Sequence, residues 1–124
     1  MAASFGNKTG PIFCLGKIIV ATPGTPVPLN QNVSTNTAFG TVASPSPMCA
    51  NQLIFQAYAG NTGNIYVCFE GGSKNLTNSI IAILAPGQTL VLGTSNLSNP
   101  YQPALLVIDG DTMSNAVQAT ALIV

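Results

Sequence analysis

The chain has 124 residues, a formal net charge of zero and only six charged side chains, and it contains no His and no Trp. This composition argues against enzymes and metal sites, because neutral amides and hydroxyls form hydrogen bonds but make poor acids and bases. It also argues against nucleic-acid and membrane partners, since no basic cluster is present to attract their charge. We therefore expect a binding or structural protein that is not an enzyme, with no catalytic, cofactor-binding or metal-ligating residues and no cofactor.

With 47% hydrophobic residues, the chain is long enough to form one domain with its own core. A surface with so few charges favours association, so we expect a homo-oligomer. Nothing at the N-terminus resembles a signal peptide, and no segment approaches the ~20 apolar residues of a membrane span. The cysteines, Cys14, Cys49 and Cys68, form no CxxC motif and are expected to be reduced, buried thiols in a protein made in the cytoplasm.

The first 14 residues show no periodic pattern and are predicted to form an N-terminal arm, followed by a β-sandwich domain over residues 15–124. Short apolar runs between clusters of Gly, Pro, Asn and Ser then predict the strands. In chain order, the predicted strands are 15–21, 25–29, 38–43, 51–58, 65–69, 80–84, 89–92, 104–108 and 116–123.

Eight or nine strands at this spacing predict an all-β fold, an antiparallel β-sandwich that resembles a jelly roll. Helix signals are nearly absent from the chain. The competing prediction is a short helical turn within Thr112–Ala119, which overlaps the last predicted strand.

The pattern within the strands predicts which side chains share a face. In the strand at 51–58, Phe55 and Ile54 are expected on opposite faces, and in the strand at 65–69 the odd-numbered residues, Phe69 included, are expected to share one face. Both faces of these strands are fairly apolar. A strand with two apolar faces is expected to be covered on its outer side too, by another copy of the chain or by a lattice partner.

Two turn segments carry residues that other proteins use for chemistry. Residues 109–112 (DGDT) resemble the start of a calcium loop, but the downstream acid of an EF-hand is missing. We predict that Asp109 and Asp111 shape a loop instead, and that replacing both by Asn leaves the turn largely intact. The Gly-rich segment 60–64 has no phosphate-binding context and is predicted to form a β-turn between the two strongest strands. The aromatic residues are expected in the core, with Tyr101 the exposed exception.

Four segments together resemble a pattern found in small structural proteins of tailed bacteriophages. They are GTPVPL at 24–29, AGNTGNIYV at 59–67, LAPGQ at 84–88 and IDGD at 108–111. The resemblance covers about residues 20–124 and departs from the pattern at Cys68, where Gly is usual, and in the N-terminal segment. Among phage structural proteins, the chain resembles the capsid decoration (cement) proteins. This resemblance implies a place in the virion capsid, with the major capsid protein as partner. It also implies a symmetric oligomer, with a trimer favoured, and no catalytic residues.

Two other functions remain open from the residues alone. A carbohydrate-binding or adhesin module on a β-sandwich would need exposed aromatic side chains. An enzyme with a Ser or Cys nucleophile would need a base, and the absence of His argues against it.

Overall fold

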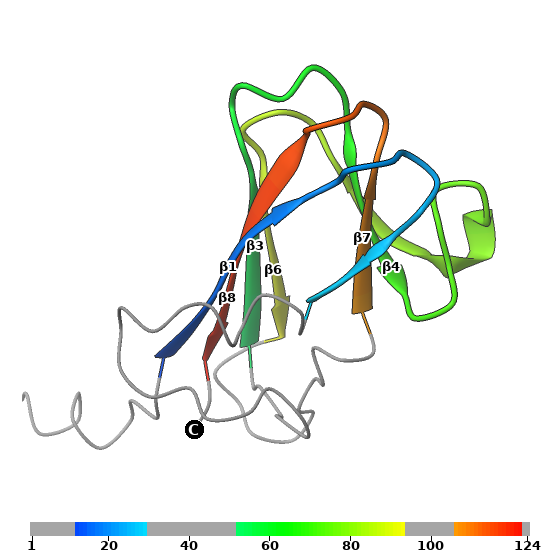
Figure 1. Ribbon diagram of the computed structural model, residues 1–124. Coiled ribbons are helices and arrows are strands. Elements are labelled where there is room, and N and C mark those ends of the chain that lie inside the picture. Colours follow the sequence, from blue (N-terminus) through cyan, green and yellow to red (C-terminus); the bar gives the residue numbers. More distant parts are fainter. Residues whose placement is uncertain (1–11, 30–51, 94–105, 123–124) are drawn as a thin grey trace, which may run out of the picture.

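The computed structural model describes residues 12–29, 52–93 and 106–122 of the chain (Figure 1). Within these ranges the regular structure is β-strand, and helical structure is confined to 3-10 turns such as η2 (Thr77–Ser79). The all-β prediction is confirmed. No helix in the described part of the chain has the length and apolar character to cross a membrane.

The strands form two four-stranded antiparallel sheets that face each other. From edge to edge, sheet A contains β1 (Ile12–Ile19), β8 (Ala116–Leu122), β3 (Gln52–Ala57) and β6 (Thr89–Gly93). Sheet B contains β2 (Val27–Pro28), β7 (Leu106–Gly110), β4 (Ile65–Phe69) and β5 (Ile80–Leu84).

The pairing follows one rule. The first strand pairs with the last, the second with the second-last, and so on inwards to β4 and β5. Two further pairings, β3 with β8 and β4 with β7, complete the sheets. This is a long antiparallel ribbon rolled into a sandwich, which is the topology of a jelly roll. The predicted antiparallel β-sandwich is confirmed.

Most predicted strands lie within a few residues of an observed one, and the predicted bounds of β4 and β5 match. The strand predicted at 38–43, like residues 1–11 of the predicted arm, lies outside the described residues. β1 begins at Ile12, inside the segment predicted as an arm. The alternative helical turn was wrong for its second half, because Ala116–Leu122 forms β8 between two strands of sheet A.

The core lies between the two sheets and follows the period-two pattern of the strands. In β3, Phe55 is fully buried, while the neighbouring Ile54 is half-buried on the opposite face and Gln56 is exposed. The opposite faces predicted for Phe55 and Ile54 are confirmed. The largest fully buried apolar side chains come from most of the strands of both sheets: Phe55, Leu15, Ile18, Leu29, Leu53, Ile65, Ile108, Val20, Val67 and Val117.

Phe69, which was predicted to share a face with Ile65 and Val67, is not buried as they are. Phe69 is 56% exposed, whereas Cys68 is fully buried. The pairing of β4 with β5 shifts register between Val67 and Cys68, but the pairing of β4 with β7 continues in register to Phe69 and Leu106, where β4 ends. The chain then reverses, with the Gly72 N–H bonded to the Phe69 carbonyl. Ser79, in the loop that follows, forms a side-chain hydrogen bond with Cys68, and burial raises the pKa of this thiol.

The connections that the structure describes mostly run from one sheet to the other. The predicted turn at 60–64 does link β3 to β4, and the Asn61 N–H bonds the Tyr58 carbonyl at 3.1 Å. The two strands nevertheless belong to different sheets, so they form no hairpin. β7 and β8 are likewise in different sheets, and Asp109 lies inside β7 rather than at a loop tip.

Candidate functional site

The face of sheet A that points away from sheet B is the candidate site. In Figure 1, no described element lies over this outer face. Strand alternation and burial place neutral or apolar side chains on it, and Lys17 is the one charged group among its described residues. The outward-facing residues are Lys17, Ile19, Gln52, Ile54, Gln56, Tyr58, Thr89, Val91, Ala116, Gln118 and Thr120.

A row of polar side chains crosses this face at right angles to the strands. Lys17 is in register with Gln118, Gln118 with Gln56, and Gln56 with Thr89. Neighbouring strands in a sheet are ~4.8 Å apart, so the row runs across the whole width of sheet A. Two glutamines at its centre supply both donors and acceptors without a charge.

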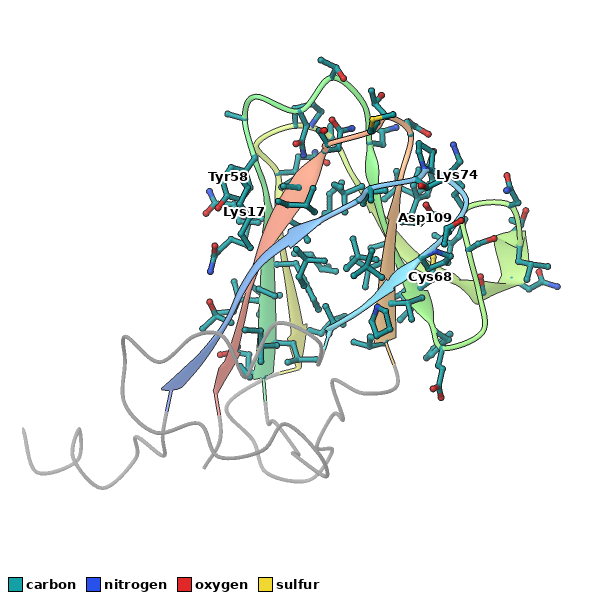
Figure 2. All side chains as sticks on the ribbon, viewed as in Figure 1. Lys17, Tyr58, Cys68, Lys74 and Asp109 are labelled. Carbon is teal, nitrogen blue, oxygen red and sulfur yellow. The ribbon has the colours of Figure 1, made fainter. Side chains whose placement is uncertain are left out.

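Tyr58 lies beside this row and lines a groove. Its hydroxyl donates to Oε1 of Gln118 at 3.2 Å, and Nζ of Lys17 lies 4.6 Å from the centre of its ring. Figure 2 shows Tyr58 and Lys17 projecting on the same side of sheet A. The groove has a volume of about 430 Å³ and is lined by Gln56, Ala57, Tyr58, Ala59, Gly87 and Gln118.

Tyr58 corrects one sequence prediction. It was expected in the core and is 36% exposed instead, because it lies just past the end of β3 at an outward-facing position. Tyr101, predicted to be the exposed aromatic residue, lies outside the described residues.

The middle of the same face is apolar. Ile54 is half-buried and in register with Val91 on one side and Thr120 on the other. Val91 is 48% exposed, and Ile19, on the opposite edge strand, is 50% exposed. The outer face therefore combines a polar row, which carries Lys17 at one end, with a β-branched row of Thr120, Ile54 and Val91.

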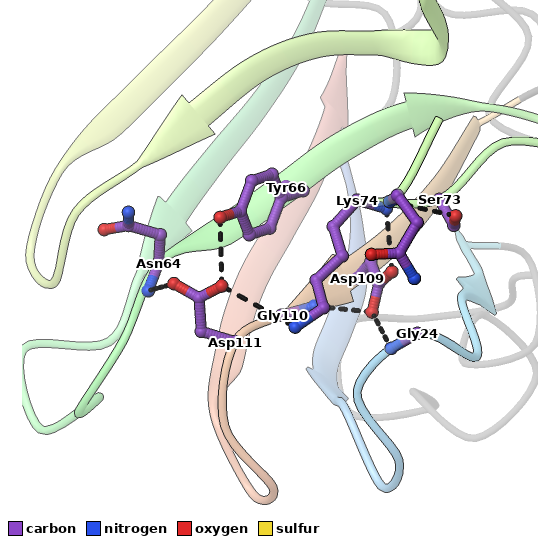
Figure 3. Close-up of polar contacts among 9 residues, drawn as sticks. Gly24, Asn64, Tyr66, Ser73, Lys74, Asp109, Gly110 and Asp111 are labelled. Carbon is purple, nitrogen blue, oxygen red and sulfur yellow. Dashed lines mark hydrogen bonds and ion pairs between the residues drawn. The ribbon is translucent and has the colours of Figure 1, made fainter. Parts of the chain in front are cut away.

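Asp109 acts as a structural anchor on the outer side of sheet B (Figure 3). It is fully buried, and its Oδ1 accepts the backbone N–H groups of Gly24 at 2.9 Å and Gly110 at 2.8 Å. Its Oδ2 accepts the N–H of Lys74 at 2.9 Å. One carboxylate thus ties β7 to the β1–β2 connection and to the loop after β4.

Asp111 is partly exposed and holds a second set of contacts (Figure 3). Its Oδ1 accepts the hydroxyl of Tyr66 at 2.9 Å, and its Oδ2 accepts the N–H of Asn64 at 3.0 Å. Nζ of Lys74 lies 3.8 Å from Oδ1. Burial, and then the Asp111 carboxylate, raise the pKa of the Tyr66 hydroxyl.

These contacts decide between the two interpretations of residues 109–112. Both oxygens of Asp109 face N–H donors, which is the opposite of what a cation requires, so the loop-shaping prediction fits the geometry and the calcium loop does not. The expectation that Asn is harmless at both positions no longer holds for Asp109, whose burial makes both oxygens necessary. Among the described residues, no group of three or more His, Cys, Asp or Glu lies together.

Sequence reasoning missed the side chains that join the β3–β4 loop to the segment between β7 and β8 and to the first residue of β8. Asn61 uses both ends of its amide on Ala116, with Nδ2 donating to the carbonyl and Oδ1 accepting the N–H, each at 2.9 Å. Oδ1 of the buried Asn115 accepts the N–H of Thr62 at 3.1 Å. The only signal in the sequence is that Asn is frequent in turns, which does not say whether its side chain ties two loops together.

Comparison with protein-family models, with curated proteins and with solved structures finds no match to this chain.

Proposed function

We propose that the protein is a non-catalytic structural component of a bacteriophage virion, of the capsid decoration (cement) type. In this proposal it binds subunits of the major capsid protein through the outer face of sheet A. The virion setting depends on the resemblance of residues 20–124 to phage structural proteins. The binding face depends on the geometry.

One observation supports the outer face of sheet A as the capsid-binding surface. Ile54 lies half-buried in the centre of an outer sheet face that has one charged side chain among its described residues. Burying such a face costs little desolvation of charge and gains about 25 cal/mol for each Å² of apolar surface removed from water. Repeated over many identical positions on a shell, even a modest gain per copy strengthens the lattice through multivalency. The jelly-roll topology fits this role, because viral capsid domains use it, although a fold does not by itself fix a function.

Replacing Ile54 by Lys is expected to abolish binding to empty capsid shells, because the interface would bury an unpaired ammonium group. The matched control is Ile83→Lys, which places the same charge at a 51%-exposed isoleucine on β5 in the other sheet. Co-sedimentation of each variant with shells that lack this protein measures the effect.

The expected result is that Ile83→Lys binds as the wild type does while Ile54→Lys remains in the supernatant. The opposite pattern would place the capsid contact on sheet B. Equal binding of both variants would show that neither sheet face carries the contact and would contradict the proposal.

The groove beside Tyr58 favours a second candidate function, the binding of a neutral glycan. Its polar lining comes from Gln56, Gln118 and the Tyr58 hydroxyl, which donate and accept hydrogen bonds as sugar hydroxyls do. The rest of its lining comes from the small residues Ala57, Ala59 and Gly87. The volume of about 430 Å³ falls in the range of small-molecule sites. This candidate and the capsid contact use the same face.

The glycan candidate predicts that wild-type protein retains neutral oligosaccharides on a glycan array and does not retain acidic ones. Gln56→Ala is expected to weaken retention about tenfold, because a sugar hydroxyl loses its partner. Gln52→Ala is the matched control, since Gln52 lies on the same face of β3 outside the groove. An array with no neutral glycan retained, or equal retention by both variants, would exclude this function.

A further inference from the structure

The outer edge of β6 is the feature that leads beyond the proposed function. Sheet A ends at β6, and among the described residues no strand pairs with its far side. The strand, Thr89–Gly93, has no Pro and no charged side chain, and its register with β3 is continuous. Natural sheets usually protect such an edge with charge, proline or a bulge.

The other three edge strands carry these protections. The pairing of β1 contains a register shift between Cys14 and Gly16, and Lys17 follows it. β2 is two residues long and ends in Pro28, which has no N–H to donate. The pairing of β5 with β4 contains the register shift described above. Within the described ranges, β6 is the edge strand that carries none of these protections.

The backbone groups that β6 offers can be assigned from two hydrogen bonds. The Ala57 N–H donates to the Gln88 carbonyl at 2.9 Å, while the Tyr58 N–H donates to Ala116 in β8 at 3.1 Å. Successive residues of a strand therefore face β6 and β8 in turn, as antiparallel ladders require. It follows that Leu90 and Leu92 face β3, and that Thr89 and Val91 direct their backbone N–H and C=O groups towards the free edge.

The core is also least complete on this side. Four apolar residues pack against the core while only partly buried, and three of them, Ile81, Leu90 and Leu92, belong to β5 and β6. These two strands form the same side of the sandwich, joined by the turn that ends β5. An added strand beside β6 would shield Leu90 and Leu92 further from water.

We propose that β6 pairs antiparallel with β6 of a second copy of this chain, about a two-fold axis at Val91. In this register Val91 faces Val91 of the second copy, Thr89 faces Gly93, and Leu90 lies opposite Leu92. The strand is thus complementary to itself, as a two-fold interface requires. It carries no charge, so two copies meet without repulsion.

The proposed pairing ends where β6 ends, and it produces a dimer. β6 ends at Gly93, whose φ of 89° belongs to the left-handed region, and Gln52 Nε2 bonds the Gly93 carbonyl at 3.4 Å. A two-fold contact closes on itself and yields a dimer, rather than the trimer that the family resemblance implies. The dimer joins two copies of sheet A into one sheet and doubles its β-branched row. This inference does not depend on capsid binding, because the dimer forms in solution.

A charge-swap experiment at Val91 tests the two-fold axis. Val91 is 48% exposed, so the folded monomer accommodates Lys or Glu at this position. Val91→Lys and Val91→Glu are each expected to weaken self-association about tenfold or more, because identical charges then face each other. An equimolar mixture of the two is expected to form a one-to-one heterodimer. Val91→Thr, which keeps shape and neutrality, is the matched control and stays dimeric.

Sedimentation velocity at micromolar concentration gives the masses, and circular dichroism confirms that each variant is folded. Val91→Pro adds a check that does not depend on charge. It removes an N–H that points away from β3, and it is expected to give a folded monomer. A monomeric or trimeric wild type, a dimer that persists in both charged variants, or a mixture that fails to form heterodimers would each overturn the proposal.

Discussion

Replacing Asp109 by Ala is expected to destabilise the protein by about 3 kcal/mol, because three backbone N–H groups, one buried and two partly buried, would lose their acceptor. The donors come from Gly24, Lys74 and Gly110. Asp109→Asn is expected to cost roughly 1–3 kcal/mol. The amide keeps one oxygen, but its NH2 group then meets an N–H donor. Chemical denaturation, read as the change in free energy of unfolding, measures both.

Asp111→Asn is the matched control, two positions along the same chain. The side chain of Asp111 is 36% exposed, so water replaces the contacts that the amide loses, and the expected cost is below about 1 kcal/mol. Equal losses for the two Asn variants would contradict the assignment of Asp109 as the anchor of three segments. Because both acids flank Gly110, their sequence contexts are similar. A difference between the two Asn variants therefore reports the effect of burial on stability.

The sequence predicted only part of the structural role of Asp109. The Asp-Gly pair indicated a turn, and turn chemistry is local enough to be read from neighbouring residues. The burial of the carboxylate depends on Gly24 and Lys74, which are 85 and 35 residues away in the chain. Only the folded ribbon brings those loops to β7. The sequence pattern therefore indicated the loop but not the buried Asp109 carboxylate that anchors it.

For the fold and the candidate face too, local features could be predicted from the sequence and long-range contacts could not. The strands were predictable because their period and their turns are short-range signals, and β5 was bounded correctly by its flanking turn residues. The polar row from Lys17 to Thr89 was not, because it arises from the registers of three separate strand pairs. Alternation identified Ile54 as outward-facing, but no sequence signal placed Gln118 next to Gln56.

Phe55→Ala is expected to cost about 3–5 kcal/mol, a large share of the roughly 5–15 kcal/mol that stabilises a typical domain. Phe55 is fully buried and heads the fully buried side chains in size. It lies in β3, inside sheet A, on the face that is turned towards sheet B. Truncation removes apolar contacts and leaves a cavity between two sheets whose hydrogen-bonded strands cannot close it. Thermal or chemical denaturation followed by circular dichroism measures the loss.

Phe69→Ala provides the matched control, with the same atoms removed from β4. Simple alternation puts Phe69 on the buried face and predicts a loss comparable to that of Phe55. In the structure Phe69 is the last residue of β4 and is 56% exposed, although β4 stays in register with β7 as far as the Phe69–Leu106 pair. The expected cost is then below about 1 kcal/mol. Similar losses for the two variants would contradict the exposed position of Phe69 at the end of β4.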